Sequence, residues 1–340
     1  MSHTSLHILV PGLAASMPGI DQLSPPLAQA TLQRFLNRAN MDRVPGYDLE
    51  STLCQLFGIE QNEHGNFPLA ALRRAGTRNI DKRLWLQAEP VCLRPDQRRL
   101  LLYDCRDLDV STDELNALAG LFINHFESEG WLVEADDPYC WYISPDGPTA
   151  ISSHSLGDVF GRSMDLFLPQ GKDRLRWHRL LNEVQMLFFD TEVNRLREAA
   201  GKMPVSGLWF SGFGYSPEPV SSQYRRIFGN DSLTAGLAQC TATPLHGIHE
   251  CNKQLLPTAG ASLVVYPEIQ RPVWRADTCD WAEKVGEFGR WLELRLDELM
   301  HDRQNELWLY PCDGRVLRYN KFSHFRFWRP SRPLSTWLKA

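Results

Sequence analysis

Four short apolar runs, each followed at once by glycine or proline, limit the folds open to this chain of 340 residues. Their apolarity is continuous rather than alternating, which is typical of strands covered on both faces, as in a mostly parallel sheet flanked by helices. Ligands bind at the carboxyl ends of such strands, so the residues that follow each run are candidates for a functional site. The runs are residues 6–10, 208–211, 262–266 and 306–310.

Composition and charge narrow the classes of partner. A formal net charge of −5 with 23% charged residues argues against the strongly basic surface that non-specific nucleic-acid binding needs. Eight scattered cysteines without a C-x-x-C pair predict mostly buried thiols in a reducing compartment. The apolar N-terminal stretch is broken by Pro11 and Gly12 and has no preceding Lys or Arg, unlike a secretion signal. We therefore expect a cytoplasmic protein with neither a membrane nor nucleic acid as its partner.

The stretch between the first two runs has a different pattern. Ser111 and Glu114 have the spacing of a capping box, which predicts the start of a helix. The apolar residues that share one face of this helix are Leu115, Leu118, Ala119, Phe122 and Phe126.

This stretch also contains a predicted hairpin and two further helices. The hairpin strands are residues 131–135 and 139–143, and the helices are residues 173–189 and 191–200. The chain thus predicts a discontinuous α/β core made of residues 1–80 and 206–340, with an α+β lid domain at residues 81–205 inserted between its halves.

Residues 193–214, VNRLREAAGKMPVSGLWFSGFG, resemble the N-x-x-R and L-W-x-x-G-x-G stretch of the archaeal-type cofactor-independent phosphoglycerate mutases, which belong to the alkaline phosphatase superfamily. Nearly the whole chain, including NEVQMLFF at residues 182–189, is similar to the bacterial RpfE-type regulatory proteins. The resemblance implies an alkaline-phosphatase-like core with an inserted lid domain. Active mutases of this superfamily use a phosphorylated serine and two divalent metals.

The chain departs from the mutase pattern where metal ligands are expected. Pro11 stands where the D-G turn of the family would place its first metal-binding aspartate, and proline has no donor atom to offer. Glu268 follows the third run in place of a histidine-led loop, and Asp313 follows the fourth without its histidine. The resemblance therefore implies a regulatory pseudoenzyme, non-catalytic or catalytically impaired, with no cofactor. It would retain a cleft for a small phosphorylated or carboxylate ligand, and its protein partner is unknown.

The alternative is an active phosphoglycerate mutase or phosphotransferase of the isomerase class. A two-metal centre needs several converging carboxylates and imidazoles. His246 and His249, with Glu250 beside them, have atoms suited to zinc or manganese, although such a pair is equally typical of an exposed loop. If the protein is active, Glu268, Asp313, His246 and His249 would hold Mn, Zn or Mg.

The nucleophile of that alternative would be Ser51, which forms a phosphoserine, or its neighbour Thr52. Both lie at the start of a predicted helix, where free N–H groups favour a phosphate. A hydroxyl at this place is also typical of an ordinary helix cap.

Four further residues are candidates for ligand binding. Asn194 and Arg197 lie on one face of a predicted helix, and a guanidinium group can grip a carboxylate or phosphate. Gly212 and Gly214 would let backbone amides approach an anion. A helix C-terminal turn explains the first pair as well, and a tight turn at a strand end explains the second.

The C-terminal segment interleaves aromatic residues with Arg326, Arg329 and Arg332. Such a pattern can stack nucleic-acid bases. In an acidic chain it more simply predicts a packed terminal strand whose arginines face solvent.

Overall fold

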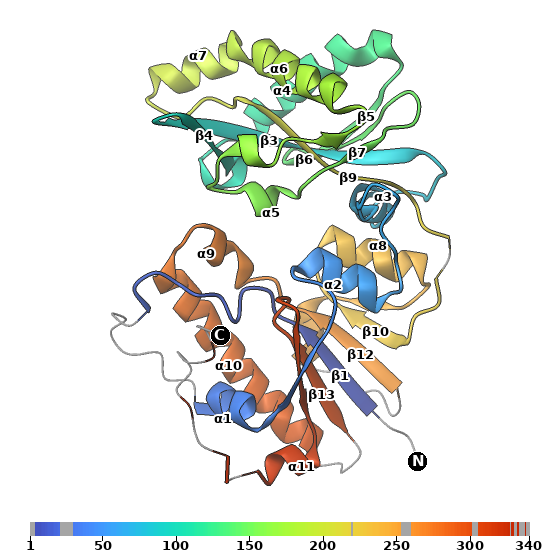
Figure 1. Cartoon of the computed structure of the whole chain (residues 1–340), viewed down its shortest axis with the longest axis vertical. Coiled ribbons are helices and arrows are strands. Elements are labelled where there is room, and N and C mark those ends of the chain that lie inside the picture. The colour runs from blue at the N-terminus through green and yellow to red at the C-terminus, as the bar shows by residue number, and fades with distance from the viewer. Residues whose placement is uncertain are drawn as a thin grey trace. The chain divides into compact units, whose positions relative to one another are not determined.

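The structure is a computed structural model that describes residues 4–20, 30–218, 220–252, 260–300, 305–326, 328–329, 332 and 337. The chain divides into two compact units (Figure 1). The core unit consists of Met1–Ile59 and Pro219–Ala340, and the inserted unit of Glu60–Glu218. The sequence suggested boundaries near residues 80 and 206. Helix α3 (Leu69–Ala75) belongs to the inserted unit because Ala70 and Ala71 pack against Trp85 of β3 (Leu84–Asp96).

A seven-stranded, mostly parallel sheet forms the centre of the core unit, in the order β11-β10-β12-β1-β13-β14-β2. Neighbouring strands from β11 to β13 are parallel, whereas β14 is antiparallel to both β13 and β2. This confirms the predicted α/β class. The strands are β1 (Thr4–Leu9), β2 (Asn40–Arg43), β10 (Tyr224–Phe228), β11 (Leu245–His246), β12 (Gly260–Val265), β13 (Glu306–Tyr310) and β14 (Arg315–Tyr319).

Helices cover both faces of this sheet. Leu6 and Ile8 of β1 pack in one hydrophobic cluster with Phe35 of α1 and Trp281 of α10. Helices α2 and α8 lie on the side away from α10 (Figure 1), so every residue of β1 is buried, as its continuous apolarity predicts. The helices are α1 (Ala30–Arg38), α2 (Leu49–Leu56), α8 (Ser232–Cys240), α9 (Gln270–Trp274), α10 (Thr278–Met300) and α11 (Lys321–His324).

An antiparallel five-stranded sheet organises the inserted unit around the long strand β3. One edge of β3 pairs with β9, and its other edge pairs with β6 and then β4. The strands added here are β4 (Arg99–Asp104), β5 (Leu132–Asp137), β6 (Cys140–Ser144) and β9 (Gly207–Tyr215), with a separate pair β7 (Ile151–Ser152) and β8 (Gln170–Gly171).

The apolar run at residues 208–211 is a strand, but its expected place in the parallel sheet is wrong. It lies in β9, antiparallel to β3 in the inserted unit. Both faces of β9 are buried there, and burial on both faces produces continuous apolarity in any sheet, whatever the strand direction. The strand β10, whose sequence YRRIF contains two arginines, takes its place in the parallel sheet.

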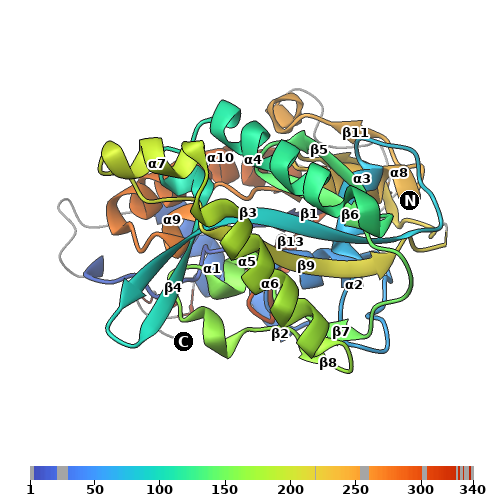
Figure 2. The ribbon, with the colours of Figure 1, turned by 90° about the horizontal axis from the view of Figure 1, so that it is seen from above.

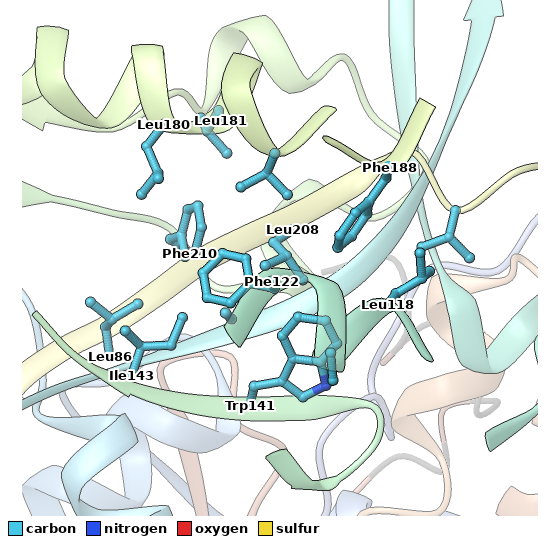
Figure 3. Packing of buried hydrophobic residues seen from close by; sticks show 14 of the residues in the cluster. Leu86, Leu118, Phe122, Trp141, Ile143, Leu180, Leu181, Phe188, Leu208 and Phe210 are labelled. Atoms are coloured by element: carbon cyan, nitrogen blue, oxygen red, sulfur yellow. The ribbon is translucent and has the colours of Figure 1, made fainter. Parts of the chain in front are cut away.

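Helices α4 (Thr112–Phe126) and α6 (Arg174–Phe189) pack over one face of this antiparallel sheet, with α7 (Glu192–Ala199) following α6 and the short α5 (Leu156–Val159) elsewhere in the unit. Figure 3 shows Phe122 and Phe188 meeting Trp141 and Phe210 of the strands. Burying each such side chain contributes about 1.5–3 kcal/mol. The predicted capping box at the start of α4 and both later helices are confirmed.

All eight cysteines are free thiols, and seven of them are buried. Of the helices in the described ranges, none combines the length and apolarity needed to span a bilayer.

Candidate functional site

A groove of about 1030 Å³ lies at the carboxyl end of β1 and β13 in the core unit. It is lined by residues that follow β1, by β2 and the segment before α2, and by the turn between β13 and β14. Arg43 and Arg315 are direct cross-strand neighbours on β2 and β14, and both line the groove. Guanidinium groups donate to phosphate and carboxylate, so the two arginines form a candidate anion site. Asp42 and Asp313 also line the groove and balance its formal charge.

Pro11 lies in a tight turn directly after β1. Gly12 has φ +83°, and a Cβ there would lie 3.0 Å from the backbone oxygen of Ile269. The indole N–H of Trp281 donates to the Gly12 carbonyl at 2.9 Å, which ties the turn to α10. The turn therefore has a packing role, and proline at its start brings no metal ligand to the sheet edge.

Asp313, in the turn between β13 and β14, is hydrogen-bonded to Arg315, the first residue of β14. Its Oδ2 accepts hydrogen bonds from Nε of Arg315 at 2.8 Å and from Nη2 of the same group. Its Oδ1 accepts the backbone N–H of Arg315 at 3.1 Å. Both carboxylate oxygens of this candidate metal ligand thus have partners within the turn.

Ser51 occupies the third position of α2 and completes a capping box with Asp48. The Asp48 Oδ1 atom accepts both the backbone N–H and the hydroxyl of Ser51, each at 2.6 Å. The Asp48 carboxylate therefore lies where a phosphate at this helix N-terminus would bind. The neighbouring Thr52 is buried and donates its hydroxyl to the Asp48 carbonyl at 2.6 Å.

The remaining candidate metal ligands are spread along the sheet edge. His246 ends β11, whereas Asp313 follows β13. These strands are separated by β10, β12 and β1, which at roughly 4.8 Å per strand spaces their ends about 19 Å apart. His246 Nδ1 lies 3.4 Å from an oxygen of Glu250. The carboxyl of Glu268 has its pKa raised by partial burial, an effect that Lys284 and His249 oppose.

Among the described residues, no group of three or more His, Cys, Asp or Glu side chains is arranged to hold a metal ion. The candidate ligands are distributed over the end of β11, the 3-10 helix that follows it, and the turns after β12 and β13, and Asp313 is already bound by Arg315. This arrangement does not fit a two-metal centre, in which several ligands converge on two ions about 4 Å apart.

Asn194 and Arg197 are buried within the inserted unit. The Asn194 amide donates to the carbonyls of Phe188 and Val205 at 2.7 and 2.9 Å. Arg197 is 1% exposed and donates to the carbonyls of Met203, Asp109 and Leu108. It also pairs with Glu114 at 3.1 Å. A ligand-binding role for the two remains a prediction, and it would require these bonds to break.

Gly212 and Gly214 lie inside β9, so the turn proposed for them is wrong. A Cβ at Gly214 would lie 2.6 Å from Cβ of Pro68, and one at Gly212 would lie 3.0 Å from the Ala70 nitrogen. The glycines thus allow β9 to approach the start of α3. Asn194 binds Val205, which precedes β9, whereas Gly212 lies five residues into that strand, about 17 Å from Gly207 at roughly 3.3 Å per residue. The structure does not bring the four candidate ligand-binding residues together.

The predicted terminal strand is wrong, because Lys321–His324 forms helix α11 and two of the following arginines bind the end of α1. Arg326 donates to the carbonyl of Arg38 at 3.1 Å and to the side chain of Asn40 at 2.6 Å. Arg329 donates to the carbonyl of Ala39 at 2.8 Å. Basic groups at helix carbonyl ends are stabilising, so these side chains have a structural role.

Two polar clusters in the structure were not predicted from the sequence. One is the groove pair, Arg43 and Arg315, whose proximity depends on strand pairing. The other is a buried cluster in the inserted unit, where the Gln87 amide donates to Glu89 at 3.1 Å and to Ser211 at 3.0 Å. Burial raises the pKa of Glu89 to about 7, against the opposing effect of Arg106. The alternating polar residues within the apolar strand LWLQAE could have signalled this cluster.

No protein-family model matches the chain. The chain is 23% identical over 133 residues to the 2,3-bisphosphoglycerate-independent phosphoglycerate mutase of Methanosarcina mazei. That match covers 38% of this chain and 28% of the archaeal protein, far less than two thirds of its length.

Two solved structures are similar over most of the chain. The PH0037 protein from Pyrococcus horikoshii has a TM-score of 0.56 and 10% identity, covering 94% of this chain and 88% of that one. The cofactor-independent phosphoglycerate mutase from Thermoplasma acidophilum has a TM-score of 0.42 and 14% identity, covering 99% of this chain and 95% of that one. The first likeness shows a shared fold. The Methanosarcina match shows that 38% of the chain is also similar in sequence to a phosphoglycerate mutase.

Proposed function

We propose that the protein is a catalytically impaired relative of the phosphoglycerate mutases, a cytoplasmic regulatory protein of the RpfE type that binds a small phosphorylated or carboxylate ligand without a metal cofactor. The observation that carries this proposal is the state of the candidate catalytic groups. The Ser51 hydroxyl is bound to Asp48, Asp313 is bound to Arg315, and His246 ends β11, four strands away from the β13 strand that precedes Asp313. Two-metal phosphoryl transfer needs such groups to converge.

The groove at the carboxyl end of β1 and β13 supports the ligand class. Arg43 and Arg315 are cross-strand partners on the neighbouring strands β2 and β14, and guanidinium groups bind phosphate and carboxylate in a bidentate manner. A bound anion would share the Arg315 guanidinium with Asp313. A regulatory protein of this kind would respond to ligand occupancy rather than turn the ligand over.

Two measurements on the purified full chain test the proposal. Metal analysis for Mn, Zn and Mg should find less than stoichiometric amounts, and mutase turnover should be absent. Calorimetric titration with 3-phosphoglycerate and with inorganic phosphate should detect binding that Arg43→Ala weakens by about tenfold or more. Arg83→Ala, which removes an exposed arginine of the inserted unit, is the matched control.

The alternative is an active metal-dependent mutase or phosphotransferase with a phosphoserine at Ser51. One contact favours it, since a carboxylate 2.6 Å from a hydroxyl can accept its proton. In that case Glu268, Asp313, His246 and His249 would hold the metals, and Asn194, Arg197, Gly212 and Gly214 the substrate. Stoichiometric metal together with turnover that Asp313→Ala and Ser51→Ala abolish would establish this alternative and overturn our proposal.

A further inference from the structure

The outer face of α6 carries an apolar stripe. Leu175, Met186 and Phe189 are 60, 75 and 76% exposed. At 100° per residue they lie on one side of the helix, opposite the buried face that contains Trp177 and Val184. Figure 2 looks onto this helical layer and shows α6 crossing β9. Single exposed apolar residues need no explanation, whereas a stripe of three large ones marks a contact surface.

Asn182 lies at the middle of the stripe, seven residues from both Leu175 and Phe189. This spacing of seven is that of a helix-pairing seam, with Leu175, Asn182 and Phe189 at equivalent positions. A single asparagine in such a seam sets the register of the partner helix because it can hydrogen-bond to its own copy. The seam is therefore symmetric about residue 182.

The side chains beside the stripe are basic near the N-terminus of α6 and acidic near its C-terminus. Arg176 and Arg179 lie on one flank in the N-terminal half of α6, and Glu183 and Asp190 lie on the same flank in the C-terminal half. If a second α6 lies antiparallel with the dyad at Asn182, Arg176 comes within about 3 Å of Asp190 along the axis. Arg179 comes equally close to Glu183. In a parallel pairing these flanks would lie on opposite sides of the seam, so the four charges would not meet.

Within this chain the two acids have exposed partners. Glu183 lies 2.7 Å from Nε2 of His125 on α4, and Asp190 lies 2.9 Å from Nη2 of Arg195. Exposed pairs of this kind contribute little to stability, and a carboxylate accepts several hydrogen bonds. These contacts leave both acids able to bind an arginine from a second molecule.

We propose that the outer face of α6 is the interface of a homodimer, in which two α6 helices pack antiparallel about Asn182 through Leu175, Met186 and Phe189. The helix has sixteen residues and is about 24 Å long. A contact made by one helix of this length on each molecule buries an area at the small end of the range for specific complexes. The dimer should therefore be weak, with a dissociation constant of about 1–100 µM. Its flanking charges make association weaker in high salt.

Sedimentation equilibrium on the full chain at increasing concentration tests the interface. Phe189→Glu and Met186→Glu should each raise the dissociation constant by about tenfold or more. Leu166→Glu, at a residue of the same unit that is also 75% exposed, should leave it unchanged. Because all three positions are on the surface, circular dichroism should be the same for every variant.

A charge exchange tests the antiparallel register. The double variant Arg176→Glu with Arg179→Glu places four acids on the flank, and Glu183→Arg with Asp190→Arg places four bases there. Each should be monomeric alone, whereas an equimolar mixture should form a heterodimer because every pair is then complementary. A chain that stays monomeric at all concentrations, a dimer unaffected by Phe189→Glu and Met186→Glu, or a mixture that fails to associate would overturn the proposal.

Discussion

Arg197 Nη1 lies 3.1 and 3.2 Å from the two carboxylate oxygens of Glu114, and Glu114 also caps the start of α4 through Ser111. One buried guanidinium group thus connects α7 to the first turn of α4. The same guanidinium group donates hydrogen bonds to the carbonyl of Met203, which follows α7, and to the carbonyl of Leu108, which precedes α4.

Arg197→Met should destabilise the inserted unit by about 3–5 kcal/mol, because the change leaves a carboxylate and several buried carbonyls without their donor. Urea denaturation followed by fluorescence measures the loss. Arg195→Met removes an exposed arginine from the same helix and should change stability by less than about 0.5 kcal/mol. Equal effects for the two variants would contradict the structural role of Arg197.

Ser51→Ala should lower the free energy of unfolding by about 1 kcal/mol, since it removes one half of the capping box with Asp48. Asp48→Ala should cost more, because Asp48 accepts both the N–H and the hydroxyl of Ser51. The double variant should cost less than the sum of the single changes, since both remove the same contact. Additive effects in thermal denaturation would show that the two residues act separately.

Gly214→Ala should destabilise the inserted unit by about 1–3 kcal/mol, because its Cβ would overlap Pro68 at the start of α3. Gly120→Ala is the matched control. It lies inside α4 with open space around its Cβ, and alanine there should stabilise the helix by about 0.5–1 kcal/mol. Chemical denaturation of the two variants should therefore shift in opposite directions.

The raised pKa of Glu89 should make the free energy of unfolding fall as the pH rises from 4.5 to about 7. Its pKa of about 7 in the fold compares with 4.5 for an ordinary glutamate, so between these values the folded state holds a proton that the unfolded state releases. The loss across this window is at most about 3 kcal/mol. Glu89→Gln should flatten the pH profile of urea denaturation between pH 4.5 and 7, and an unchanged slope would contradict this origin.

The lowered pKa of His7 should make the free energy of unfolding of the core unit fall as the pH is lowered. Burial lowers its pKa to about 4 from 6.5, and the ring is bonded to the Tyr310 hydroxyl at 3.0 Å. Between these values the unfolded state binds the proton, so stability is lost as the pH falls from 6.5 toward 4. His7→Gln should reduce that loss in denaturation series at pH 5 and 7. A loss as large as in the parent chain would exclude His7 as its source.

Much of the secondary structure could be predicted because its signals are local. The capping box at Ser111 depends on residues three apart, and the faces of α4 and α6 depend on a helical period. The strand at residues 208–211 was recognised by its apolarity, but its sheet was not. Its partner β3 lies more than a hundred residues earlier in the chain, and apolarity does not encode the direction of a neighbour.

The candidate site illustrates the same division. Residue types alone show that Pro11 brings no ligand to the end of β1 and that few imidazoles follow the parallel strands. The folded chain was needed to show that Arg197 is enclosed by carbonyls, that Asp313 is held by Arg315, and that Arg43 lies opposite Arg315. Residue type sets which bonds a side chain can make, whereas long-range strand pairing and packing set which partners reach it.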